Sequence, residues 1–108
     1  MSVDRVEAFR EILEQNPEDA FARYGLAMEY RQRGETNFAL AQFDELERRH
    51  PDYTAGYQMA AQTLMTEGRM AEAGQRLQTG IASARRTRNQ HALGEMEAML
   101  EEVEEQSR

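Results

Sequence analysis

The two histidines are the side chains with the widest range of chemistry in this sequence, but their positions do not favour catalysis or metal binding. His50 precedes Pro51 in an expected turn, and His91 falls far away in an expected helix. The pair therefore lacks the short helical spacing of a two-histidine metal site. Cysteine is absent, which excludes thiol nucleophiles and thiolate metal sites. No glycine-rich phosphate loop or serine-nucleophile motif is present. We expect no enzymatic activity, catalytic residue, metal or cofactor.

An arginine cluster near the C-terminal end could take part in ionic contacts. Arg85, Arg86 and Arg88 lie in a stretch from 73 to 94 that carries no acid, and a glutamate-rich tail begins at Glu95. One interpretation is a solvated turn followed by a solvated helix face. The other is a docking site that receives an acidic segment, for example the tail of a second copy.

The balance of charge excludes several kinds of partner. The net charge is -7, and all 13 basic residues are arginine. Such a chain lacks the basic face that binds nucleic acid or an anionic membrane, so we expect neither as a partner. No apolar stretch approaches the ~18 residues of a membrane-spanning helix, and the N-terminal residues lack a signal pattern. We expect a cytoplasmic protein.

Any binding residues must be positioned by a repeated helical pattern. Residue types recur at an offset of 34 residues, so that Gly34 matches Gly68 and Pro17 matches Pro51. Within each unit the apolar residues are spaced by three and four positions, which is typical of amphipathic helices. Glycine favours the end of a helix, and the residue before proline disfavours helix. These signals predict six helices near 3–15, 18–33, 36–49, 53–67, 70–87 and 89–105.

The spacing resembles the tetratricopeptide repeat family, which distributes large and small residues over 34 positions. The first unit carries the pattern as Leu26, Ala27, Tyr30, Ala39, Phe43 and Pro51, and the second as Tyr57, Ala60, Ala61, Leu64, Ala73 and Leu77. In two places the sequence departs from the family pattern. Arg23 replaces a large aromatic residue, and Arg85 stands where a proline would end the second unit. The helix from 70 is therefore expected to run on into Thr87.

The resemblance implies an all-α fold, a short right-handed α-solenoid of about six antiparallel helices. It implies one domain over 1–108. Within it, 3–17 would be an orphan N-terminal helix, 20–53 and 54–87 two full repeats, and 88–106 a C-terminal capping helix. Small residues would let the helices approach closely and large ones would fill the space between them.

The resemblance also implies a concave groove that receives an extended peptide or a partner helix. By alignment the groove would be lined by Phe21, Tyr24, Met28, Arg31, Gln58, Met59, Gln62, Met65 and Met96, and the last helix could also add Met99. Methionine adapts its shape to a partner, and amides can hydrogen-bond a peptide backbone. The alternative is that the end helices bury several of these residues. The lysine–asparagine clamp for a C-terminal carboxylate, known in part of the family, is not reproduced.

The function expected from this resemblance is that of a non-enzymatic adaptor or scaffold for another protein or peptide segment. A different function, self-association as a homodimer, would use the last helix and the arginine cluster. Apolar residues at three–four spacing in that helix either cap the last repeat or form a dimer seam. They are Leu93, Met96, Leu100 and Val103.

Overall fold

The computed structural model describes residues 4–107 and contains six α-helices in this range, with no strand. The helices are α1 (Arg5–Gln15), α2 (Ala20–Gln32), α3 (Thr36–Arg49), α4 (Thr54–Thr66), α5 (Met70–Arg86) and α6 (Gln90–Gln106). The prediction of six helices is confirmed, and position 3 of the first predicted helix lies outside the described residues. No helix in the described part of the chain is long and apolar enough to cross a membrane.

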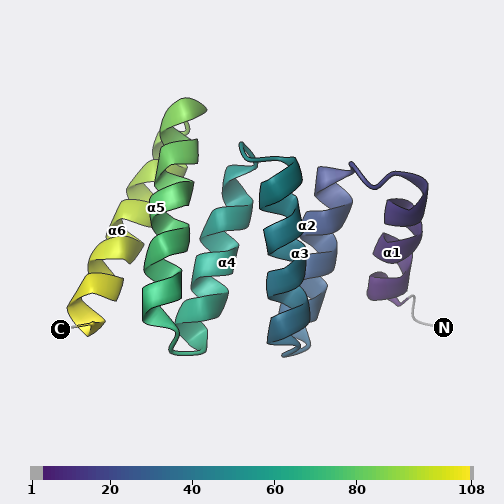
Figure 1. Cartoon of the computed structure of the whole chain (residues 1–108), viewed down its shortest axis with the longest axis horizontal. Coiled ribbons are helices and arrows are strands. Elements are labelled where there is room, and N and C mark those ends of the chain that lie inside the picture. The colour runs from purple at the N-terminus through teal and green to yellow at the C-terminus, as the bar shows by residue number, and fades with distance from the viewer. Residues whose placement is uncertain (1–3, 108) are drawn as a thin grey trace. The chain divides into compact units, whose positions relative to one another are not determined.

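The helices form two compact units, the first ending at His50 and the second beginning at Pro51. In the first unit α2 packs against both α1 and α3 (Figure 1). In the second unit α5 packs against both α4 and α6, and α6 also contacts α4. Each unit therefore has a central helix with a neighbour on either side.

Small and large residues share the core as the repeat pattern predicts. Ala27 and Ala39 are fully buried in the first unit, and so is the large side chain of Phe43. The second unit has an equivalent set of buried residues, Ala60, Ala61, Leu64, Ala73 and Leu77. The alanines let helix axes approach closely, while the large side chains supply most of the apolar area removed from water.

The turns that follow α2 and α4 are built around a glycine in the left-handed conformation. Gly34 and Gly68 have φ angles of 76° and 75°. At each turn the residue after the glycine donates its N–H to a carbonyl in the last turn of the helix, Glu35 to Tyr30 and Arg69 to Leu64. This is the Schellman motif, and it confirms the predicted ends of these two helices.

The turn after α5 has the same geometry but carries an arginine. Arg88 has a φ of 57°, the only positive value at a non-glycine position among the described residues. Asn89 donates its N–H to the Ala84 carbonyl at 2.8 Å, as in the two glycine turns. No proline interrupts α5, which reaches Arg86 with Thr87 as its C-terminal cap. The helix therefore ends one residue before the expected end at Thr87.

Replacing Arg88 with glycine is expected to stabilise the protein by about 0.5–1 kcal/mol. The left-handed conformation costs a residue with a Cβ atom roughly 1–2 kcal/mol, and the greater freedom of glycine in the unfolded chain offsets part of the gain. Urea denaturation followed by circular dichroism measures the change. The reverse substitution, Gly68→Arg, should destabilise the protein by a similar amount. If both substitutions changed the free energy of unfolding in the same direction, the left-handed turn would not be the cause.

Arg23, at the position where the repeat pattern has a large aromatic residue, makes polar contacts instead of filling a core. Its guanidinium donates to the Pro17 carbonyl at 3.0 Å and to Oε1 of Gln42 at 2.9 Å. These bonds connect the turn before α2 to α3. Nearby, hydrogen bonds from Arg48 and then Arg49 lower the pKa of Glu45 to about 2, so this carboxylate stays charged well into the acid range.

Candidate functional site

A groove in the second unit brings together residues from α4, α5 and α6. It encloses about 320 Å³. Its lining consists of three methionines and four polar side chains, namely Gln62, Met65, Thr66, Met70, Met99, Glu102 and Gln106. We call it the α4–α6 groove. Gln62 and Met65 were predicted as groove residues, and the structure places them side by side here.

Helical spacing and one turn position these side chains. Gln62, Met65 and Thr66 lie three and four residues apart on α4, so they share one face of that helix. Met99, Glu102 and Gln106 likewise follow one another at three and four residues on α6. Met70 is the first residue of α5 and comes directly after the turn at Gly68.

The groove offers adaptable apolar contacts beside hydrogen-bonding groups. Met65, Met70 and Met99 are half-buried, so part of each thioether chain remains open to solvent. Methionine changes rotamer easily and fits partners of irregular shape. The amides of Gln62 and Gln106 can donate to or accept from a peptide backbone. Gln106 also donates to Oε1 of Glu102 at 3.3 Å. This arrangement is suited to holding a side chain and its flanking backbone.

The four predicted groove residues of the first unit lie along α2. Phe21, Tyr24, Met28 and Arg31 are spaced by three, four and three residues, so they form one stripe. Phe21 is 72% exposed, the highest value among the large hydrophobic residues described. The Tyr24 ring meets the buried Phe43 ring edge-on at 6.4 Å, and Met28 and Arg31 are half-buried. We call these four residues the α2 stripe.

The structure corrects the prediction for Met96. Its side chain is fully buried, and its sulfur approaches the backbone of Gly80, opposite Tyr57. Met96 therefore fills the core between α5 and α6 and is not open to a ligand. Met99, about one turn further along the same helix, lines the groove instead. Gln58 and Met59 are half-buried on α4 and do not line the α4–α6 groove.

The three arginines of the candidate docking site have different surroundings. Arg85 lies 3.7 Å from Glu97 on α6. Arg86 pairs with Asp52 at 2.8 Å and also donates to the Pro51 carbonyl. Two of the three thus contact acceptors within their own unit. Arg88 is exposed and makes no ion pair with any residue from 4 to 107.

Four groove residues were missed by sequence reasoning, namely Thr66, Met70, Glu102 and Gln106. A signal for two of them was present, because Glu102 and Gln106 continue the helical spacing that begins at Met99. Met70 could not be found that way, since it reaches the groove through a turn and not through the periodicity of α4 or α6.

The histidines lie apart from the groove. His50 Nε2 is 2.8 Å from the Glu18 carbonyl oxygen, and His91 Nε2 is 2.7 Å from Glu95 on the same helix. Within residues 4–107 no group of three histidine, aspartate or glutamate side chains is placed to hold a metal ion.

Comparison with known proteins identifies the family. No protein-family model matches the chain, and no curated protein sequence does. Among solved structures, a tetratricopeptide repeat domain protein from Salinibacter ruber is 32% identical, with a TM-score of 0.77 over 82% of this chain and 90% of that one. The chain belongs to the tetratricopeptide repeat family. The prediction made from the 34-residue spacing is confirmed.

Two further solved structures are similar in fold at lower identity. The TPR2B domain of yeast Sti1, solved as a pHsp70 complex, is 19% identical, with a TM-score of 0.86 over 94% of this chain and 81% of that one. PcrH, solved with the chaperone-binding region of PopD, is 18% identical, with a TM-score of 0.88 over 95% and 78%. The all-α, tetratricopeptide-like fold class is thereby confirmed.

Proposed function

We propose that this protein is a non-enzymatic adaptor that binds an extended or helical segment of another protein in the α4–α6 groove. The α2 stripe of the first unit would be a second contact surface. The observation that carries the proposal is the groove itself, whose lining combines three half-buried methionines with two glutamine amides. Such a lining gives apolar contact area and backbone hydrogen bonds, the two needs of segment recognition.

The family supports recognition as the activity. The structures of Sti1 and PcrH that resemble this chain were both solved with a protein partner. Their sequence identity to this chain is too low for their ligands to be assigned to it. The kind of segment that this protein binds is therefore inferred from its own groove residues. That segment would place one or two apolar side chains over Met65 and Met99, with its backbone beside Gln62 and Gln106.

The groove does not suit a segment that ends in a free carboxylate at this place. Its lining contains Glu102 and no cationic side chain. A carboxylate of the partner would therefore meet like charge without a compensating donor from lysine or arginine. We propose an internal segment of the partner, recognised mainly by its apolar side chains.

A quantitative pull-down from the source lysate, read by mass spectrometry, tests the proposal. The wild type is compared with the double variant Met65→Glu, Met99→Glu, which places two charges on the apolar floor. We expect the captured partner to fall at least about tenfold, because a buried unpaired carboxylate is costly at an interface. The milder double variant Met65→Ala, Met99→Ala should reduce the captured partner by a smaller factor. It still tests the groove if the glutamate variant does not fold.

The matched control is Gln75→Glu, Thr79→Glu, which adds the same charge at two exposed positions on α5 outside the groove. It should capture the partner as the wild type does. Failure to enrich any protein over empty beads would contradict the proposal. So would a partner retained equally by the groove variants and the control.

A further inference from the structure

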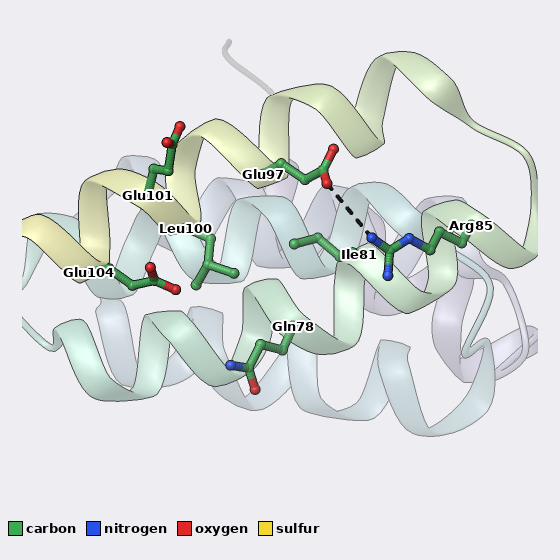
Figure 2. Close-up of a pocket in the computed structure, with 7 residues that line it drawn as sticks. All are labelled: Gln78, Ile81, Arg85, Glu97, Leu100, Glu101 and Glu104. Carbon is green, nitrogen blue, oxygen red and sulfur yellow. Dashed lines mark ion pairs between the residues drawn. The ribbon is translucent and has the colours of Figure 1, made fainter.

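A second and larger groove lies between α5 and α6 (Figure 2). It encloses about 580 Å³ and shares no lining residue with the α4–α6 groove. We call it the α5–α6 groove. The two grooves use different faces of α6, because neighbouring residues such as Met99 and Leu100 point about 100° apart around a helix.

The floor of the α5–α6 groove is apolar and runs along the helices. Ile81 on α5 and Leu100 on α6 face each other across it (Figure 2). Leu100 is half-buried, so part of its side chain lies open to solvent. On α5 the lining residues Gln78, Ile81 and Arg85 are three and four positions apart, which gives a stripe about two turns long.

The rim of the groove is acidic. Glu97, Glu101 and Glu104 line it from α6, spaced by four and three residues, and Arg85 is the one cation among the lining residues. Arg85 lies 3.7 Å from Glu97, so the other two carboxylates of the rim have no cationic partner among the lining residues. Neither Glu101 nor Glu104 forms an ion pair with a residue of the described range 4–107.

The position of these carboxylates on α6 makes the local electrostatic potential more negative. Glu101 and Glu104 lie in the second half of the helix, where the partial charge of the helix dipole is negative. In the last turn of α6 no basic residue offsets that charge. A basic side chain of a partner would therefore be attracted both by these carboxylates and by the negative end of the helix dipole.

From this geometry we propose that the α5–α6 groove docks a basic amphipathic helix of a partner protein. Two parallel stripes of about two turns fit a helix lying lengthwise, with apolar residues at i, i+3 or i+4, and i+7. These residues would cover Ile81 and Leu100. Lysine or arginine on the side of the helix that faces α6 would reach Glu101 and Glu104. The charge of the rim selects a basic helix over an acidic one.

A fluorescence-anisotropy titration with a synthetic probe tests the proposal. The probe is a capped peptide of about 18 residues with leucines on one helical face and arginines on its flanks. Two control peptides accompany it, one with the same residues in an order that has no apolar face and one with glutamate in place of arginine. We expect the probe to bind at least about tenfold more tightly than either control at moderate salt.

Charge-reversal variants locate the binding site. Glu101→Lys, Glu104→Lys should weaken binding of the probe at least about tenfold. The matched control, Glu95→Lys, Glu105→Lys, makes the same change of net charge on α6 outside the groove and should change it less than about twofold. All four positions are exposed, so both variants should keep the helix content of the wild type by circular dichroism.

Three results would overturn the proposal. The first is a probe that binds no better than the control peptides. The second is an equal loss in both charge variants, which would show a response to net charge alone. The third is a wild-type chain that sediments as a dimer and becomes monomeric with Glu101→Lys, Glu104→Lys, because a second copy would then cover the groove. The variants Met65→Glu, Met99→Glu should bind the probe normally, which separates this test from that of the α4–α6 groove.

Discussion

Replacing Phe43 with alanine is expected to lower the free energy of unfolding by about 3–5 kcal/mol. Phe43 is fully buried in the first unit and meets the Tyr24 ring edge-on. Removal of its ring takes away apolar contacts and leaves a cavity that the neighbouring helices fill only in part. Urea denaturation followed by circular dichroism gives the change in free energy, provided that the slope with denaturant stays constant.

The matched control for this substitution is Phe21→Ala, which removes the same ring from a side chain that is 72% exposed. Its effect should stay within about 0.5 kcal/mol. A Phe43→Ala variant no less stable than Phe21→Ala would contradict the assignment of Phe43 to the core.

The second large effect is expected at Gly80, where three helices of the second unit meet. A methyl group placed on Gly80 would lie 2.7 Å from the Met96 sulfur and 2.7 Å from Cβ of Tyr57. The Tyr57 atom is fixed to the backbone of α4, so the clash cannot be relieved by a change of rotamer. Gly80→Val should destabilise by about 3 kcal/mol or more, at or above the upper end of typical overpacking costs.

Gly94 provides the control for Gly80, because it also lies within a helix but has no atom near its added Cβ position. Gly94→Val should be neutral or stabilising by a few tenths of a kcal/mol, since valine is the better helix former. The two variants are compared by thermal and urea denaturation. Similar stability in both would show that α4, α5 and α6 do not approach each other at Gly80 as described.

The fold could be predicted from the sequence because its signals are local and repeated. Gly34, Gly68, Pro17 and Pro51 mark helix ends through their own backbone preferences, which depend little on the rest of the chain. The alternation of alanine with large residues repeats at the same offset and so identifies the packing. Arg88 gave no such signal, because its left-handed conformation is imposed by the turn and not favoured by its residue type.

The candidate site was predictable only in part, because exposure depends on which face of a helix its neighbours cover. Met65 and Met96 are the same residue type on neighbouring helices, yet Met65 lines a groove and Met96 is fully buried. Because Gly80 has no side chain, α6 can approach α5 closely there, and Met96 packs against this glycine. The sequence shows the glycine but not which methionine it will face.

The arginine cluster shows the same limit for charge. In the sequence Arg85, Arg86 and Arg88 form one basic group, but their contacts come from different parts of the second unit. Glu97 lies near Arg85 across the α5–α6 groove, and Asp52 pairs with Arg86 from the start of the unit. An arginine is open to a partner only if no acid of the folded chain pairs with it. The spacing of residues in the sequence does not show which acids, far away along the chain, will come close.

The most direct test of recognition in the α4–α6 groove uses the methionine methyl groups as reporters. With the methyls labelled in carbon-13, the segment of the captured partner is titrated into the protein and the spectra are recorded by NMR. The signals of Met65, Met70 and Met99 should shift progressively, and that of buried Met96 should move least. If these three signals stay unchanged at saturation while the segment binds, recognition takes place elsewhere and the central claim is wrong.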